Sequence, residues 1–347
     1  MPPMTTTGDI SYRTAGYMSR ELLKRAQPLL LITRLGQPKP LPKNNTRTIK
    51  FRGYHHLPND VKLLTEGVTP AASKPKFHDI EAIIDQMGDW IELTDVLTDT
   101  HEDPLIPEFC DILGEQSAQM IEKKTIEHLM GGTNVFFAGL NGGNLAMGRD
   151  EVNEPLTLAL QRRVIRGLKR QNAQQITTVV NASPNFGTSP IPPSYIAVAH
   201  TDLEADIREM RGFVPCERYG GGFKPMEGEL GSVEGVRYCL TTMLDAFVGA
   251  GGTPRPGVEV EIDQGGTNMA NVYPVFYFAK NAFGTIPFAR DGRRGASPIT
   301  PMVLNPNVPR GGDPLGQRGS IAWKAWHAAV ILYDAYMARA EVCASAL

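Results

Sequence analysis

The sequence predicts an α+β protein of about two domains. Its length gives the number of domains, its composition argues against a helical bundle, and the strand and helix patterns along the chain give the class. The 347 residues exceed twice the roughly 150 residues of a typical domain. Hydrophobic residues make up 41% of the chain and charged residues 21%, which argues against a disordered chain and against a membrane bundle. Glycine (35) and proline (27) together exceed their usual share of roughly 12%. This excess predicts many turns and long excursions, and it argues against a helical bundle.

The charge balance and the cysteines narrow the function classes. Lys and Arg number 35 and Asp and Glu 37, a net charge of −2, whereas a dedicated DNA-binding protein is usually basic; contact with nucleic acid should therefore be weak. The apolar runs at 28–32 and 328–332 are far shorter than the roughly 20 residues that span a bilayer, and residues 1–30 contain no apolar signal-peptide core. The four cysteines form no CxxC pair, which indicates a reducing cytosol.

The N-terminal part of the chain predicts an arm followed by a long hairpin. Residues 1–45 are polar and irregular, with one short helix expected at 19–27 and an extended, proline-rich linker at 36–45. Basic and apolar residues alternate over 46–57, which is typical of a half-buried strand. A second β-prone stretch at 79–95 follows some 20 loose residues. A loop of this length is usually functional, and we interpret the whole as an arm-like hairpin.

Two helices are expected next. The first covers 103–132, where Asp103 is a good cap and Pro104 suits the first turn; about 27 helical residues would span roughly 40 Å. The second covers 155–171 and starts at Pro155, with apolar residues recurring every four positions. The rest of this helix is crowded with cations: Arg162, Arg163, Arg166, Lys169 and Arg170. They indicate either a solvated face or a contact with phosphate or a partner.

From residue 191 onward, short strands alternate with glycine-rich loops, as in a separate α+β unit. A strand is expected at 192–200, a capped helix at 201–210, and further strands at 271–288. The acidic stretch 258–263 alternates as an edge strand would. For the last segment, 313–342, the pattern alone does not separate strand from helix.

Only one constellation suggests catalysis. His200 and Asp202 form an H-x-D motif at the end of a predicted strand, where metal hydrolases often place ligands. A metal site needs a third ligand, and the other histidines are scattered. The adjacent His55 and His56 would point to opposite faces of a strand. There is no P-loop, dinucleotide fingerprint or nucleophile elbow. We therefore predict no catalytic, cofactor-binding or metal site, and we infer an assembly protein, since projecting elements must bury their surface against other chains.

A series of motifs resembles the N-four-type major capsid proteins of tailed bacteriophages. They are "RTIKFRGYHHLP" (47–58), "LTEGVTP" (64–70), "GDWIELTD" (88–95), "GTNVFFAG" (132–139), "LKRQNAQQIT" (168–177), "AHTDLEADIREMRGFVPCERY" (199–219), "EGELGSVEGVRY" (227–238) and "DPLGQRGSIAWKAW" (313–326). The resemblance spans about residues 45–345 and implies the Hong Kong 97 coat-protein fold. It also favours strand over helix for much of 320–342.

The resemblance implies a domain division, partners and a location. The N-terminal arm would be 1–45, the extended loop with its flanking strands 46–95, the peripheral domain with its spine helix 96–192 and 300–347, and the axial domain 193–299. The subunit would form the hexamers and pentamers of an icosahedral shell around the genome of a double-stranded DNA phage. Portal, a separate scaffolding protein and a decoration protein are the expected partners, without cofactor or membrane. The expected location is the virion capsid, assembled in the host bacterial cytoplasm.

Two other functions remain open at this point. One is a metal-dependent hydrolase that uses His200 and Asp202, which would contain bound metal. The other is an oligomeric phage tail or adhesion protein, which would form rings or fibres instead of closed shells.

Overall fold

A computed structural model describes most of the chain. The described residues are 30–39, 41–42, 47–54, 57, 63, 66–67, 72–96, 105–141, 143–180, 188–219, 225–226, 228–263, 265, 268–286, 288–289, 299–309 and 312–346. The expected helix at 19–27, the cap at Asp103 and Pro104, the histidines 55 and 56, and most of the loop 58–77 lie outside these residues. In the described part of the chain, no helix combines the length and apolar character needed to cross a membrane.

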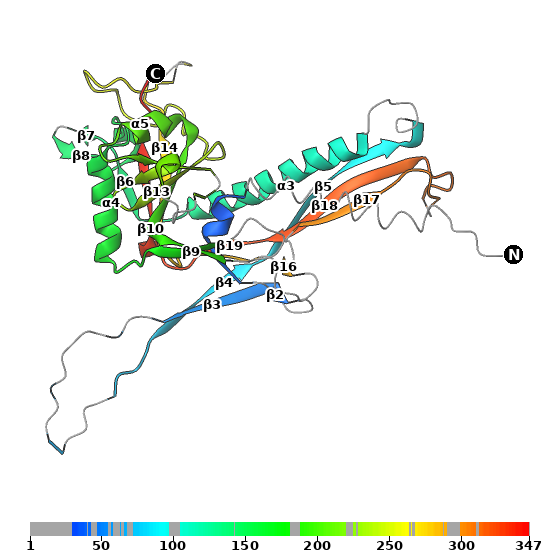
Figure 1. Ribbon diagram of the computed structural model, residues 1–347, viewed down its shortest axis with the longest axis horizontal. Coiled ribbons are helices and arrows are strands. Elements are labelled where there is room, and N and C mark those ends of the chain that lie inside the picture. Colours follow the sequence, from blue (N-terminus) through cyan, green and yellow to red (C-terminus); the bar gives the residue numbers. More distant parts are fainter. Residues whose placement is uncertain are drawn as a thin grey trace.

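The body of the molecule is built on a mixed eight-stranded sheet (Figure 1). Its strands follow the order β11 (Val214–Pro215), β12 (Glu229–Val233), β13 (Val236–Thr241), β10 (Thr188–His200), β14 (Tyr273–Phe278), β20 (Met337–Val342) and β6 (Val135–Phe137), and β9 (Ile176–Val180) pairs with β10. The β10–β13 and β20–β6 pairs are parallel and the other pairs antiparallel. Strands from distant parts of the sequence therefore share one sheet.

The two faces of this sheet are covered by different helices. Tyr195 and Ala197 of β10 pack in the core that includes α4 (Leu158–Arg170) and α5 (Glu204–Glu209). Ile196 and Val198, which point to the opposite face because side chains alternate along a strand, pack with the C-terminal end of α3 (Leu105–Leu129). The α4 helix and the α3 helix thus lie on opposite sides of the sheet.

The α3 helix leaves the body and extends along a three-stranded sheet (Figure 1). This sheet has the order β17 (Ile299–Leu304), β18 (Arg318–His327) and β5 (Asp85–Thr94), all antiparallel. At 1.5 Å per residue, the 25 residues of α3 span about 38 Å, close to the expected length. Its buried side chains meet those of the sheet around Trp323, which is fully buried. We call α3 with these three strands the spine unit.

A second projection is the hairpin of β3 (Thr48–Tyr54) and β4 (Phe77–Ile83), which points away from the body in another direction (Figure 1). Its root has a small core of its own, in which Phe51 packs with residues near β15 (Phe283–Thr285) and β19 (Ala329–Ile331). A side chain at Gly284 would place its Cβ only 2.8 Å from the Phe51 ring, so a glycine is needed at this crossing. We call β3, β4 and their connection the extended hairpin.

Smaller elements complete the fold. They are the strands β1 (Gln37–Pro38), β2 (Leu41–Pro42), β7 (Leu140–Asn141), β8 (Asn144–Leu145) and β16 (Phe288–Ala289), and the 3-10 turns η2 (Ile32–Leu35), η3 (Arg149–Glu151), η4 (Thr201–Leu203), η5 (Cys216–Arg218) and η6 (Asp334–Tyr336). The β1 strand pairs with β15 and β2 with β16. Part of the segment expected to be a linker, 36–45, is therefore attached to the body.

Several local expectations are confirmed and others are wrong. The strands near 46–57 and 79–95 and the long helix are present, and 313–342 forms strands joined by one 3-10 turn. The second helix does not start at Pro155, because Thr157 is its N-cap and the Thr157 hydroxyl accepts the Leu160 N–H. The segment 258–263 forms only two isolated bridges. The capped helix expected at 201–210 is instead η4 followed by α5, and its first turn is capped by the His200 side chain.

Candidate functional site

The extended hairpin has one polar and one apolar face. Lys50 lies opposite Glu81 and Arg52 opposite Asp79, with Nζ–Oε1 and Nε–Oδ1 distances of 2.6 and 2.8 Å. The hydrogen bond from Arg52 lowers the pKa of Asp79, and that to Glu81 raises the pKa of Lys50. Such exposed pairs stabilise little, but opposite charges facing each other favour this register. The other face, with Phe51, packs at the root.

Beyond its root, the extended hairpin leaves apolar side chains in solvent. Leu63 is 87% exposed and Leu57 and Phe77 are also exposed, while Ile83 is an exposed residue at the root itself. Leu63 and Phe77 therefore add little to the subunit's own core; Leu64 and Val68 of the same loop lie outside the described residues. Exposed apolar groups on a projecting element are typical of a surface that another chain covers.

The spine unit ends in a second apolar surface, which no sequence pattern indicates. Leu315, in the connection between β17 and β18, is 75% exposed, and Leu304 and Val308 beside it are exposed as well. Trp90 on β5 is also largely exposed. The alternation of side chains within 299–304 and 318–327 could have indicated the strands β17 and β18. It does not indicate which of their apolar side chains stay exposed to solvent. The molecule therefore presents apolar groups on both of its projections.

The third feature is a buried polar chain that attaches the N-terminal segment to α3. The Thr33 N–H and hydroxyl donate to Glu122 Oε2 at 3.3 and 3.2 Å, and burial raises the pKa of Glu122 to about 7. Next to them, the Thr125 hydroxyl lies 3.3 Å from Thr33 Oγ1 and 2.9 Å from His327 Nε2. Burial lowers the pKa of His327 to about 4. These contacts join η2, α3 and β18.

His200 and Asp202, the pair that a hydrolase would use, form a local cap. His200 Nδ1 accepts the Asp202 N–H at 3.1 Å, and its ring lies against Tyr273 with centroids 5.3 Å apart. The Tyr273 hydroxyl contacts Asp202 Oδ2 at 2.9 Å and Glu261 Oε2 at 2.5 Å, and burial raises the pKa of Tyr273. Among the described residues, no three His, Cys, Asp or Glu side chains are grouped to hold a metal ion. The geometry therefore assigns His200 and Asp202 a capping role.

The four cysteines are not brought together either. Cys110, Cys239 and Cys343 are buried in different parts of the body and spine unit, Cys216 is half-buried, and all four are free. Burial raises the pKa of Cys110 to about 11 and of Cys343 to about 12. Because the thiolate is the reactive form, these two thiols are poor nucleophiles.

Comparison with known proteins places this architecture. The sequence matches no family model and no curated protein. The structure is similar to a chain from the capsid of Ralstonia phage GP4, with a TM-score of 0.62, 12% identity, and coverage of 90% of this chain and 88% of that one. Similar matches are the capsid of cyanophage Pam1 (TM-score 0.56, 13% identity, 93% of each chain) and of cyanophage P-SCSP1u (0.55, 11%, 91% and 89%). The chain therefore has the fold of phage capsid chains.

Proposed function

We propose that this chain is the major capsid subunit of a tailed double-stranded DNA phage, which assembles into the icosahedral shell around the genome. The observation that carries this proposal is the match to phage capsid chains over about nine tenths of both chains. The exposed apolar groups on both projections support it, because a subunit in a shell covers such groups with its neighbours. The role is structural, and no enzymatic step is part of it.

The two projections have separate tasks in this proposal. The extended hairpin lies over a neighbouring subunit and buries Leu63 and Phe77 there, while the tip of the spine unit with Leu315 meets further neighbours. Each fully buried aliphatic or aromatic side chain stabilises a contact by roughly 1.5–3 kcal/mol. A shell repeats every contact many times, so modest contacts are sufficient. The remaining interface is the edge of the body, which meets its copies in hexamers and pentamers.

The sheets support a proposal for the domain division. We propose a peripheral domain made of the spine unit and an axial domain built on the eight-stranded sheet. That sheet includes β6 and β20, so the axial domain takes in 135–180 and 337–346 as well as 193–286. The resemblance to capsid proteins implies the peripheral domain for these two outer ranges. We propose the axial domain for them instead, because α4, β10, β14 and β20 share one core.

The proposed partners are copies of this chain first, then a portal, a separate scaffolding protein and a decoration protein. The proposed location is the virion capsid, with assembly in the host cytoplasm. These follow from the proposed function and are tested with it.

Electron microscopy and sedimentation of the full chain, expressed with its neighbouring phage genes, test the assembly. We expect closed shells of hexamers and pentamers. Rings, tubes or fibres would instead favour a tail or adhesion protein, and an exclusively monomeric or dimeric protein would contradict the proposal.

A variant set isolates the extended hairpin. Replacing residues 60–75 by a short Gly-Ser turn should leave a folded subunit by circular dichroism and abolish shells. Leu63→Ser should weaken assembly, whereas Lys74→Ser, a matched change at an exposed polar position of the same loop, should not. Normal shells from the loop replacement would overturn the role assigned to this hairpin, and an unfolded subunit would place the loop in the core.

A further inference from the structure

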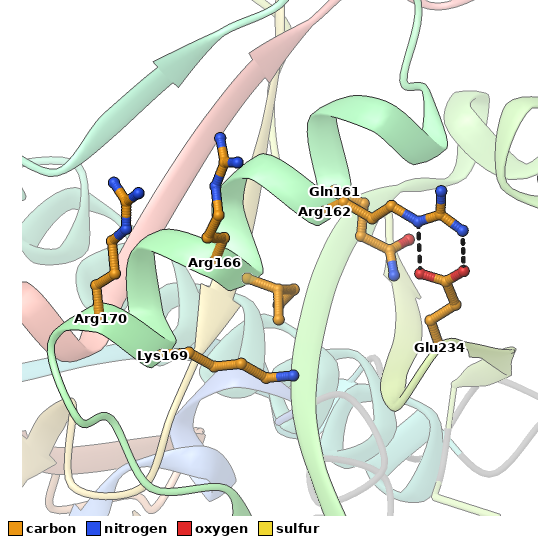
Figure 2. A pocket seen from close by; sticks show the side chains of 7 residues that line it. Gln161, Arg162, Arg166, Lys169, Arg170 and Glu234 are labelled. Carbon is orange, nitrogen blue, oxygen red and sulfur yellow. Dashed lines mark hydrogen bonds and ion pairs between the residues drawn. The ribbon is translucent and has the colours of Figure 1, made fainter.

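The α4 helix carries a row of cations on its outer side. Arg162, Arg166, Lys169 and Arg170 line a hollow of about 380 Å³ beside Glu234 of the β12–β13 turn, and Figure 2 shows that all four side chains come from α4. The only acidic group in its lining is Glu234, so the lining has a net charge of three positive units, from four cations and one carboxylate. The chain as a whole has a net charge of −2. The positive charge is therefore a local feature.

The hollow is held in shape by fixed contacts. Glu234 and Gly235 both have positive φ (47° and 81°), as in the tight type I′ turn that joins two antiparallel strands. The Arg162 guanidinium binds both carboxylate oxygens of Glu234 (Figure 2), with an Nε–Oε2 distance of 2.8 Å. Beside it, the Gln161 amide donates to the Val233 carbonyl at 2.9 Å. The helix and the turn are therefore fixed relative to each other.

Three of the four cations remain available. Arg162 is paired with Glu234, but in the described part of the chain Arg166, Lys169 and Arg170 make no ion pair with an acidic side chain. The favourable interaction of cations with the C-terminal end of a helix accounts for Lys169 and Arg170, which lie in the last turn. It does not account for Arg166 one turn earlier, or for the hollow.

The composition of the hollow indicates the kind of partner. Its lining contains one apolar side chain, Ile165, which is itself buried, and no aromatic one. Protein interfaces place apolar and aromatic groups at their centre, whereas interfaces with DNA are polar and positively charged. Binding of single strands uses aromatic side chains on which the bases stack. The lining therefore fits the phosphate groups of a duplex better than a protein or a single strand.

We propose that Arg166, Lys169 and Arg170 bind backbone phosphates of the packaged double-stranded DNA, without reading its sequence. This inference rests on the proposed function, which supplies the DNA, and it places the α4 side of the eight-stranded sheet on the inner surface of the shell. Because three contacts per subunit are few, each subunit holds the DNA weakly and the DNA can still leave the shell. The opposite side of the sheet, with α3, faces away from this contact.

Fluorescence anisotropy of the full-length subunit with a labelled 30-base-pair duplex tests the proposal. Each phosphate contact contributes about 0.9 to the slope of log affinity against log salt, so three contacts should lower the affinity about 40-fold between 50 and 200 mM salt. The triple variant Arg166→Gln, Lys169→Gln, Arg170→Gln should lose most of this dependence. A control variant removes the same charge from exposed positions elsewhere, with the substitutions Arg208→Gln, Arg211→Gln and Arg318→Gln. This control should keep the salt dependence of the wild type.

The outcomes separate the alternatives. Equal DNA binding by the α4 variant and the wild type, or an equal loss in both triple variants, would overturn the proposal. Competition by polyglutamate as effective as that by duplex DNA would identify an acidic protein as the partner and would also overturn it. Electron microscopy of the same variants keeps the two proposals apart: both triple variants should form shells, and a wild-type chain that forms none would count against the capsid function alone.

Discussion

Glu122 and His327 should each make the free energy of unfolding of the subunit depend on pH. The two dependences have opposite sign, so they cancel in the wild type. Burial raises the pKa of Glu122 from 4.5 to about 7, so the folded state holds a proton that the unfolded chain has released. Its contribution to stability is complete below pH 4.5 and is lost as the pH rises to 7. Burial lowers the pKa of His327 from 6.5 to about 4. That contribution is complete above pH 6.5 and is lost as the pH falls to 4.

The magnitudes follow from these values. One proton changes the free energy of unfolding by about 1.4 kcal/mol per pH unit, and the two ranges overlap between pH 4.5 and 6.5. Across these two pH units each group contributes about 3 kcal/mol, with opposite sign. The free energy of unfolding of Glu122→Gln should therefore increase by about 3 kcal/mol relative to that of the wild type as the pH rises from 4.5 to 6.5. His327→Gln should lose about the same amount over the same range.

Guanidinium unfolding of the purified subunit at four pH values between 4.5 and 6.5, followed by circular dichroism, measures these differences. Comparison with wild type removes the titration of all other groups, and the double variant serves as a control because its curve should run parallel to the wild type. A single variant that differs from wild type by a constant amount at every pH would refute the reasoning. It would mean that water reaches these side chains in the folded subunit.

Three further predictions concern packing and contact. Trp323→Ala removes the fully buried centre of the spine unit and should cost about 3–5 kcal/mol, seen as a lower midpoint in thermal unfolding; a change below about 1 kcal/mol would contradict the packing described. Thr157→Ala removes the N-cap of α4 and should cost about 1 kcal/mol in the same assay, while Thr157→Asp should restore it. Leu315→Ser should change subunit stability by less than about 0.5 kcal/mol but slow shell formation measured by light scattering, and unchanged assembly would exclude the spine tip from the interfaces.

Local patterns determined the individual elements. The alternation over 46–57 predicts β3 because side chains on a strand point to opposite faces, and here one face packs at the root while Lys50 and Arg52 pair in solvent. The long apolar stripe before two glycines predicts α3, which ends at Leu129. The start of α4 expected at Pro155 is too early, because the Thr157 hydroxyl caps the helix and Leu158 is its first residue. The exact end of a helix can depend on a single capping hydrogen bond.

The sequence by itself thus determined the class of the protein, its long helix, its projecting hairpin and, through the ordered motifs, the resemblance to capsid subunits. Only the tertiary structure decided which strands share a sheet, because β20 lies between β14 and β6 although some 60 and 200 residues separate them along the chain. The same holds for the pairing of Glu122 with Thr33, 89 positions apart, and for the hollow that α4 forms with Glu234. Contacts at such distances follow from how several faces bury their apolar groups together, which no local pattern records.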